Sequence, residues 1–351
     1  MKPASHVAVD HIDLKRFAEQ AFATRGMAPE NAEILADTLV WADLRDVGSH
    51  GVFRLPRYLK FMDRGEMDPK ARIEPRLELP AALVFEANKA PGALAMMHAT
   101  RAASERAKTV GLCYAIVSHT THTGAIGYFA HRAAQRGFAA IVASAGTPNM
   151  AYHGARVPSI STSPVSIAVP GGRHGVIALD MSTAILGIGR LAQAKERGEP
   201  LPEGIALDGD GNPTTDAAKA TTPLPLGGAK GSGLALMLEC IGGLLAGSPI
   251  LAGMIAPGCR IGHAHNGIVI VLDIKQFRPV ADFEADLEEL AAAVKSLPRR
   301  DGVDQLLLPG ERGNAALEQA LVHGARISAG TWAELEKISA ATGIPLPAPK
   351  Y

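Results

Sequence analysis

The sequence predicts a mixed α/β fold in which helices occupy both ends of the chain and strands alternate with helices in the middle. Three observations predict it. Residues 11–46 carry two runs of apolar side chains at helical spacing. From about residue 80, short runs rich in β-branched residues alternate with helical ones. Residues 283–297 and 331–343 then return to a helical pattern. This arrangement is typical of an α/β or α+β protein.

The N-terminal region is predicted to be helical because its apolar residues recur every three or four positions. In residues 11–26 they fall on one stripe, and Gly26 follows as a C-terminal stop. Residues 29–46 form a second predicted helix, with Pro29 at its start and acidic residues in its first turn.

The middle of the chain supplies the predicted sheet. The expected strands are residues 112–119, 138–144, 163–170, 175–182 and 266–277. The expected helices are residues 98–111, which Gly111 ends, 125–137 and 231–247. These strands are too closely spaced for a plain βαβ repeat, so a mixed or antiparallel sheet is expected.

Two segments of the middle region differ from this alternation. Residues 231–247 are apolar almost throughout, which predicts a buried helix. Residues 195–228 are rich in Gly, Pro, Asp and Thr and are predicted to form a long surface excursion, because strong elements lie on both sides.

Composition excludes several classes of function. Lys and Arg together number 35, as do Asp and Glu, so no basic excess points to nucleic acid. The three cysteines form no CxxC pair, which argues against a zinc knuckle or a disulfide framework. No signal-peptide pattern occurs, and no run reaches the roughly 18 apolar residues of a membrane span. A soluble, cytoplasmic protein without membrane or nucleic-acid partners is expected.

The stretch Gly48–Tyr58, "GSHGVFRLPRY", is the first candidate for chemistry. If a helix starts after Ser49, then His50, Arg54 and Tyr58 project from one face. Histidine exchanges protons near neutral pH, and the planar arginine fork matches a carboxylate. A proton donor beside a carboxylate clamp suits a 2-oxo or 2-hydroxy acid. The alternative is a capped surface helix with Ser49 as its N-cap.

Two further stretches could bind a ligand. In "SHTTHTGAIGYFAHRAAQ", a predicted strand leads into a helix whose free N–H groups could receive an anion. The spacing of His119, His122 and His131 fits no zinc pattern, so no metal site is expected. In "PLGGAKGSGLALM", Lys230 lies among glycines, which could cradle a phosphate or carboxylate although the spacing is not that of a P-loop. The alternatives are an ordinary strand–helix turn and a flexible loop that caps a helix.

Absent motifs narrow the choice. No GxGxxG opens a helix after a strand, so a dinucleotide would need a site unlike the Rossmann fold. HExxH and GxSxG are absent as well, which disfavours zinc proteases and α/β-hydrolases.

Six blocks, taken in order, resemble the type-2 malate/L-lactate dehydrogenase family, which includes ureidoglycolate and sulfolactate dehydrogenases and diketogulonate reductase-like enzymes. They are "SHGVFRLPRY", "HTGAIGYF", "STSPVSIAVPGG", "LDMST", "GGAKGSGLALM" and "LLLPGER". The resemblance implies an NAD- or NADP-dependent oxidoreductase with a non-Rossmann cofactor domain at residues 79–284. It also implies a helical substrate-binding and dimerisation domain formed by residues 1–78 and 285–351, and a homodimer.

The resemblance also implies roles for individual residues. His50 would be the proton donor, assisted by Ser49, and His122 takes a proton-transfer role in some members. Arg54, Tyr58 and Thr162 would contact the substrate. The implied cofactor contacts are His122, Thr123, Gly124, Ala125, Ile126, Asp180, Met181, Ser182, Lys230, Gly231, Pro309, Gly310, Glu311 and Arg312.

Departures from the family pattern concern the substrate. Arg190 stands where imine-reducing members carry an aspartate, and Ser163 where asparagine is usual. This favours an oxo or hydroxy acid over an imine, and Arg190 could add a second cation for a dicarboxylate. Three alternatives stay open: a cyclic imine reductase using NADPH, an enzyme in which Lys230 forms a Schiff base, and a small-acid binding protein without catalysis.

Overall fold

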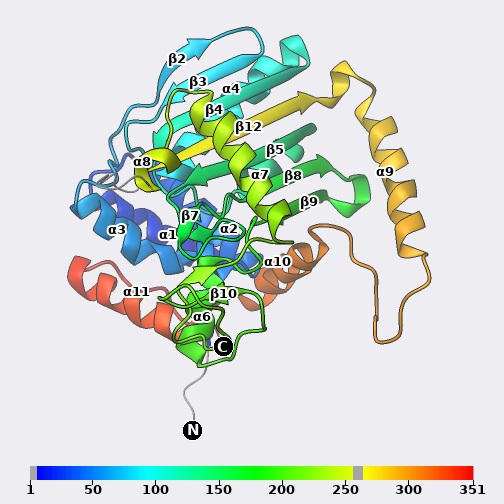
Figure 1. Cartoon of the computed structure of the whole chain (residues 1–351). Coiled ribbons are helices and arrows are strands. Elements are labelled where there is room, and N and C mark those ends of the chain that lie inside the picture. Colours follow the sequence, from blue (N-terminus) through cyan, green and yellow to red (C-terminus); the bar gives the residue numbers. More distant parts are fainter. Residues whose placement is uncertain (1–5, 256–263, 351) are drawn as a thin grey trace.

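A seven-stranded sheet forms the centre of the molecule (Figure 1). The structure, a computed structural model, describes residues 6–255 and 264–350. The strands, in their order across the sheet, are β2 (Glu74–Glu78), β3 (Ala82–Glu86), β4 (Leu112–Thr120), β12 (His265–Asp273), β5 (Phe138–Gly146), β8 (Val165–Pro170) and β9 (Val176–Met181). Only β3 and β4 run parallel; the other neighbours are antiparallel. The predicted mixed sheet is confirmed.

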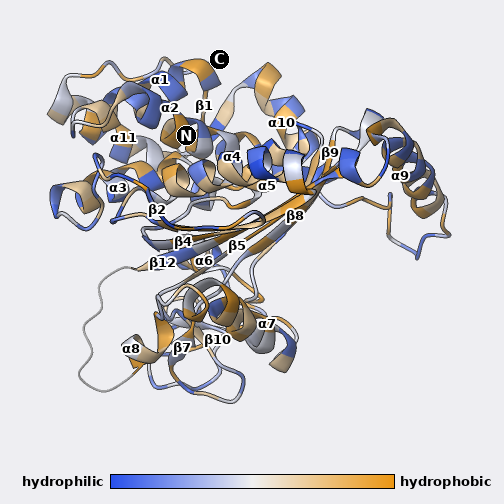
Figure 2. Ribbon diagram, turned by 90° about the horizontal axis from the view of Figure 1, so that it is seen from above, coloured by the Kyte–Doolittle hydropathy of each residue, from blue (hydrophilic) through white to orange (hydrophobic). Residues whose placement is uncertain are grey.

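One face of the sheet is covered by α4 (Gly92–Val110) and α5 (Gly127–Ala134), as Figure 2 shows. Small buried residues such as Ala95, Ala99 and Ala103 let α4 approach the strands closely. Gly267 of β12 leaves room for Met96 at this contact, because a Cβ there would lie 2.0 Å from the Met96 sulfur.

The two ends of the chain meet in the next layer. The strand β1 (His6–Val9) pairs antiparallel with β13 (Ala325–Ser328). Around this pair lie the helices α1 (His11–Ala23), α2 (Pro29–Leu44), α3 (Leu55–Asp63), α10 (Glu311–His323) and α11 (Ala329–Thr342). Their buried side chains belong to the same hydrophobic core as the sheet and α4. The division into two domains stays a prediction.

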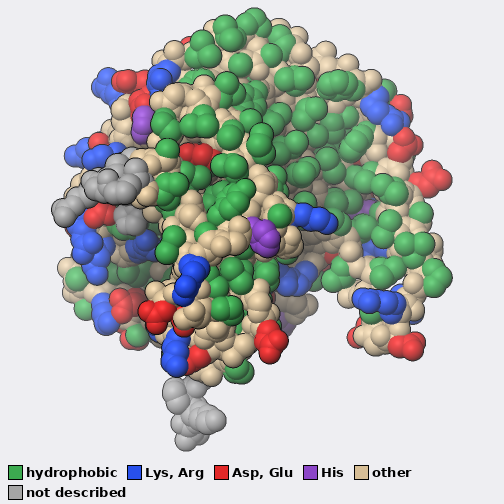
Figure 3. All heavy atoms as spheres, viewed as in Figure 1, with side chains coloured by type: hydrophobic (Ala, Val, Ile, Leu, Met, Phe, Trp, Pro, Cys, Tyr) green, Lys and Arg blue, Asp and Glu red, His purple; other side chains and the backbone are tan. Residues whose placement is uncertain are grey.

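The opposite face of the sheet carries α7 (Ala229–Glu239), which continues as a π-helical turn over Cys240–Leu244, and then α8 (Leu251–Ile255). The prediction of a buried helix over 231–247 is wrong. Met237 and Leu245 are 56% and 66% exposed, because α7 packs only one side against the sheet. Figure 3 shows hydrophobic side chains gathered over this face.

Residues 195–228 do more than form a surface excursion. They begin in the last turn of α6 (Ile188–Arg197) and contain the short pair β10 (Ala206–Leu207) and β11 (Thr222–Pro223). Their apolar side chains form a small core with α6; its buried members are Leu191, Ala194, Leu201, Ile205, Ala206, Ala217 and Ala220. Scattered Gly and Pro residues hide this core in the sequence. A two-stranded pair of β6 (Met150–Ala151) and β7 (Pro158–Ile160) lies on the same side of the sheet (Figure 2).

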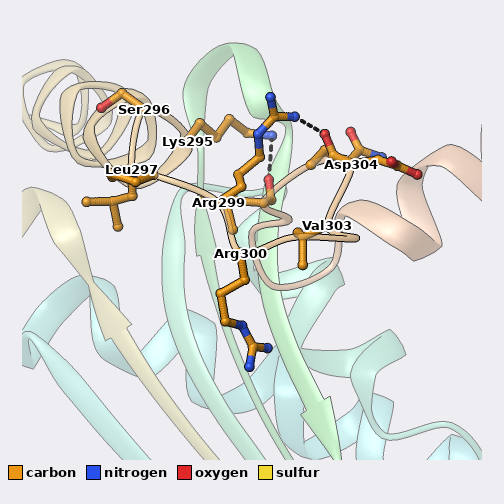
Figure 4. Close-up of a pocket in the computed structure, with 10 residues that line it drawn as sticks. Lys295, Ser296, Leu297, Arg299, Arg300, Val303 and Asp304 are labelled. Carbon is orange, nitrogen blue, oxygen red and sulfur yellow. Dashed lines mark hydrogen bonds between the residues drawn. The ribbon is translucent and has the colours of Figure 1, made fainter.

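The helix α9 (Val280–Lys295) projects from one side of the molecule as an arm (Figure 1). The loop after it encloses a hollow of about 790 Å³, lined by residues 295–300 and 303–306. Figure 4 shows Arg299 turned toward Asp304, whose backbone carbonyl accepts a hydrogen bond from it. None of the predicted catalytic, substrate or cofactor residues lines this hollow, so the candidate site lies elsewhere.

No helix in the described part of the chain has both the length and the apolar character that crossing a bilayer requires.

Candidate active site

A cavity of about 560 Å³ brings together segments that are far apart in the sequence. Its walls come from the end of α2 and the loop that follows it, from the start of α5, from β9 and from the starts of α6 and α10. Of the predicted residues, those that line it are Ser49, His50, Arg54, Gly124, Ala125, Ile126, Thr162, Asp180, Met181, Ser182, Arg190, Pro309, Gly310 and Arg312.

The loop that carries His50 is not a single helix. Two 3-10 turns, Gly48–His50 and Val52–Arg54, precede α3, and Pro56 lies in the first turn of α3. The expectation that one helix presents His50, Arg54 and Tyr58 is therefore wrong. The extended backbone at Gly51 breaks the helix. A Cβ at this glycine would lie 1.8 Å from a carboxylate oxygen of Asp43, so only glycine fits there.

Hydrogen bonds fix the shape of this loop. The Asp43 carboxylate accepts a hydrogen bond from the Val52 N–H at 2.8 Å, and Arg54 Nε donates to the Ser49 carbonyl at 2.7 Å. Burial raises the pKa of Asp43 to about 7, and the Val52 hydrogen bond opposes that shift.

The His50 imidazole is held on two sides. Its Nδ1 lies 3.0 Å from Ser49 Oγ, and its ring stacks on the ring of His122 with 5.6 Å between centroids. Burial, with the Arg54 cation as the second cause, lowers the pKa of His50 to about 3. His50 is therefore neutral near pH 7.

The tautomer of His122 follows from its neighbours. Tyr58 Oη lies 2.6 Å from Nδ1, and the Gly124 N–H donates to the same nitrogen at 3.3 Å. Because a backbone N–H can only donate, Nδ1 is the acceptor and the ring proton is on Nε2. Burial, followed by Arg54 and His50, places the pKa of His122 well below its usual value. Tyr58 thus contacts His122 instead of lining the cavity.

Arg54 is 8% exposed, and the described residues include no carboxylate in an ion pair with it. Burial is the main reason that the pKa of its guanidinium is lowered. A buried cation without a counter-ion is costly unless an anion comes to it. An anionic group of a ligand in the cavity would offset this charge.

Close backbone approaches shape the other end of the cavity. A Cβ at Gly127 would lie 2.3 Å from Asp180 Oδ2, and one at Gly310 would lie 3.1 Å from the Ala178 carbonyl. The Gly127 N–H donates to Asp180, and the Ala178 N–H donates to the Pro309 carbonyl. Burial raises the pKa of Asp180 to about 6, although the Gly127 hydrogen bond and the Arg45 cation oppose the shift.

Five predicted residues besides His122 do not line the cavity: Tyr58, Thr123, Lys230, Gly231 and Glu311. Lys230 is exposed at the start of α7. Gly231 allows a tight approach, because a Cβ there would lie 2.5 Å from the Thr183 carbonyl. Glu311 binds Lys295 and the Leu308 N–H, both at 2.8 Å. Their predicted cofactor contacts stay predictions, and the geometry gives no support to a Schiff base at Lys230.

Among the lining residues that sequence reasoning missed are three with side chains suited to ligand binding, Trp41, Arg45 and His131. Trp41 lies in the last turn of α2, and Arg45 is its C-cap. In the sequence, their spacing is the same as that of helix residues that only pack against the core. His131 was considered only as a metal ligand, and within the described residues no group of three His, Cys, Asp or Glu side chains is placed to hold a metal.

Two buried polar atoms near the α10 end lack hydrogen-bond partners. They are Nη1 of Arg45 and Nδ1 of His131. Unpaired buried donors are rare in folded proteins and indicate a missing ligand or water. Together with the glycine contacts at Gly127 and Gly310, they fit an extended polar ligand such as a dinucleotide.

Comparisons with known proteins agree with this geometry. The model of the malate/L-lactate dehydrogenase family matches residues 9–336. A malate/(S)-sulfolactate dehydrogenase of Methanothermus fervidus is 31% identical over 82% of this chain and 84% of its own. An NAD⁺ ureidoglycolate dehydrogenase of Escherichia coli is 28% identical over 90% of each chain.

A solved structure extends the likeness to the fold. The malate dehydrogenase of Pyrococcus horikoshii superposes with a TM-score of 0.88 over 97% of each chain, at 27% sequence identity. The family match covers nearly the whole chain, and the six sequence blocks lie in the order that the resemblance implies. The chain therefore belongs to the malate/L-lactate dehydrogenase family.

Proposed function

We propose that the protein is an NAD(P)-dependent oxidoreductase that transfers hydride between the nicotinamide and C2 of a small 2-hydroxy or 2-oxo acid. One observation carries the proposal: the buried guanidinium of Arg54 has no carboxylate partner among the described residues and lies beside a neutral histidine, His50. The relatives named above are dehydrogenases of malate, sulfolactate and ureidoglycolate. All three are 2-hydroxy acids.

In the proposed reaction, each of these cavity residues has a separate role. The Arg54 fork binds the C1 carboxylate in two parallel hydrogen bonds and so fixes the C2 oxygen toward His50. In oxidation, His50 removes the hydroxyl proton, and in reduction it returns it to the carbonyl oxygen. Ser49 keeps the imidazole oriented through the 3.0 Å contact. The bound nicotinamide supplies or accepts the hydride at C2.

Substrate binding itself prepares His50 for its task. In the free protein Arg54 contributes to the low pKa of His50. A carboxylate on Arg54 would offset that charge and raise the pKa, so that His50 holds a proton more readily once substrate is bound. His122 helps to hold the His50 ring in position, because the two rings stack and the Tyr58 hydroxyl fixes His122 in turn.

Arg190 favours a substrate with a second acidic group. It lines the same cavity as Arg54, and the described residues place no carboxylate within ion-pair distance of it. The first turn of α6 brings it there, since a Cβ at Gly189 would lie 2.6 Å from Ser49 Cβ and 3.6 Å from Arg54 Nη2. A dicarboxylate such as malate could bind both cations.

The test is a panel of substrates with NADH and NADPH, monitored by the loss of absorbance at the nicotinamide. We expect turnover with 2-oxo acids, and the highest kcat/KM with those that carry a second acid. Turnover only with a cyclic imine carboxylate would support the alternative reductase instead. No turnover with any member, despite cofactor binding, would leave a small-acid binding protein.

We further propose that the protein is a homodimer that buries the apolar face of α7. The side chains exposed there and on the adjacent sheet and arm are Leu234, Leu236, Met237, Ile241, Leu244, Leu245, Ile167, Leu179, Leu290 and Leu297. Apolar patches that extend over several elements mark protein interfaces in soluble proteins. Light scattering should give twice the chain mass.

A pair of variants tests this assignment. Met237→Glu should produce monomers, whereas Ile12→Glu, at an exposed position on α1, should leave the dimer intact. A wild-type mass of one chain at micromolar concentration would contradict the proposal. The cytoplasmic location stays a prediction.

A further inference from the structure

The corner of the cavity at the C-terminal end of α2 holds a cation, Arg45, that has no ion-pair partner among the described residues. Arg45 is 6% exposed, and its guanidinium lies 5.0 Å from the centroid of the Trp41 ring. Nη2 donates to Asn314 Oδ1 at 2.7 Å, whereas Nη1 is buried without a partner. Asp180 attracts this charge, but it is not within ion-pair distance. Arg45 therefore keeps both a charge and a free donor.

His131 borders the same corner. It is 7% exposed, its ring meets that of Trp41 edge-on at 5.8 Å between centroids, and its Nδ1 has no partner. Burial, with Arg45 and Arg132 as further causes, lowers the pKa of His131 to about 4. Burial alone opposes a positive charge on this ring, and the contributions of Arg45 and Arg132 show that these two cations add a positive potential there.

The backbone adds to that potential. Gly313 lies in the first turn of α10, and a Cβ there would lie 3.2 Å from Arg45 Nη2, so the helix start and the guanidinium are in close contact. The N-terminus of a 13-residue helix carries free N–H groups and a partial positive charge. Arg312, which also lines the cavity, follows Glu311 in the same turn.

We propose that Arg45 and His131 form a receptor for a phosphate group of the dinucleotide cofactor. This inference rests on the proposed function. The free Nη1 of Arg45 donates to a phosphate oxygen, and Nδ1 of neutral His131 donates to another when it carries the ring proton. Asn314 holds the guanidinium through its 2.7 Å hydrogen bond, and the electrostatic attraction of Asp180 partly offsets the positive charge of the corner.

The experiment measures equilibrium binding instead of turnover. NADH is titrated by its fluorescence, and inorganic pyrophosphate and adenosine are titrated as competitors against it. Arg45→Gln should weaken NADH and pyrophosphate about 10- to 150-fold, the range for one hydrogen bond to a charged group. Adenosine carries no phosphate, so its affinity should stay within about twofold. His131→Phe preserves the ring contact with Trp41 and should weaken NADH by about 2- to 12-fold.

Asn314→Ala is the matched control, because it removes the structural partner of Arg45 and leaves the guanidinium in place. It should bind NADH nearly as tightly as the wild type. If Arg45 only joins α2 to α10, then Asn314→Ala and Arg45→Gln will lower the melting temperature alike and change NADH and adenosine affinity together. That result would overturn the inference.

Three further results would also test the phosphate receptor. A folded Arg45→Gln protein that binds NADH and pyrophosphate like the wild type contradicts the phosphate receptor. If that variant does not fold, Arg45→Lys takes its place, and we expect weaker NADH binding because the fork is lost; unchanged binding would again contradict the receptor. If the wild type itself does not bind NADH or NADPH, the proposed function fails, and that failure is distinct from failure of Arg45 alone.

Discussion

His122 and His131 lie in the same short stretch of chain and serve opposite ends of one cavity. Burial lowers the pKa of both rings, so both are neutral near pH 7. The Nδ1 of His122 receives hydrogen bonds from Tyr58 and from the Gly124 N–H, whereas the Nδ1 of His131 has no partner. The His122 ring is therefore fixed in the free protein, whereas Nδ1 of His131 is still available to a ligand.

The difference in hydrogen bonding between the two rings matches two tasks, proton transfer and cofactor recognition. Groups that move a proton work best when they are already oriented, since reorganisation during the reaction costs rate. Groups that recognise a cofactor can hold free donors that the ligand then satisfies. Variants at the His50 end should therefore change turnover most, and variants at the Arg45 end should change affinity.

The largest effect is expected for His50→Ala. Loss of a general acid–base group costs about 10²–10⁴-fold in rate, so kcat should fall by that factor. NADH affinity, measured by fluorescence, should remain close to that of the wild type, because His50 is at the other end from Arg45. Near wild-type turnover in this variant would show that the loop has only a structural role.

Arg54→Lys should come next. Lysine keeps the charge and loses the planar fork, so KM for the 2-oxo acid should rise by about 10- to 100-fold, with a smaller change in kcat. Steady-state kinetics on the substrate that the panel identifies would measure it. Arg57→Lys, one turn away on α3, serves as the control, and an equal effect in both variants would contradict a specific clamp.

Tyr58→Phe should have a moderate effect. It removes the hydroxyl that holds His122 and leaves the buried ring in place, so kcat should fall by about 2- to 12-fold, the range for one neutral hydrogen bond. KM should change little, because Tyr58 does not line the cavity. A rise in KM alone would instead indicate the substrate contact that the family resemblance implies.

The last prediction concerns stability instead of activity, and it is a pH dependence at Asp43. Burial raises its pKa in the folded protein from 3.8 to about 7. Its contribution to stability is then full below about pH 3.8 and is lost as the pH rises through about 7. Asp43→Asn keeps an acceptor for the Val52 N–H and removes the titration.

Urea unfolding at several pH values would measure this difference. The free energy of unfolding of the wild type should fall relative to that of Asp43→Asn between pH 4 and pH 8. Parallel curves for the two proteins would show that Asp43 is not perturbed.

Local sequence patterns predicted most of the fold. The amphipathic stripe of α1, the helix stop at Gly111 and the hairpin of β8 and β9 each follow from local spacing and turn residues. The exposed side of α7 could not be predicted, because a run that is apolar on all sides does not say which side packs against its own chain.

The candidate site was predictable where chemistry and motif coincide. His50, Arg54 and the glycines near Asp180 belong to recognisable blocks, and they line one cavity. Arg45 and His131 lie in helical sequence that looks like ordinary packing. Only the folded structure shows that each carries a buried nitrogen without a partner.

The pairing of β1 with β13 joins the first described residues to some of the last. On a ribosome that adds roughly 5–20 residues per second, the N-terminal strand and helices wait roughly 15 to 60 seconds for this partner. The helix α10, which supplies one wall of the cavity, emerges only just before β13. A chain interrupted late in synthesis thus already contains His50, Arg54 and Arg45, yet has no complete cavity in which to use them.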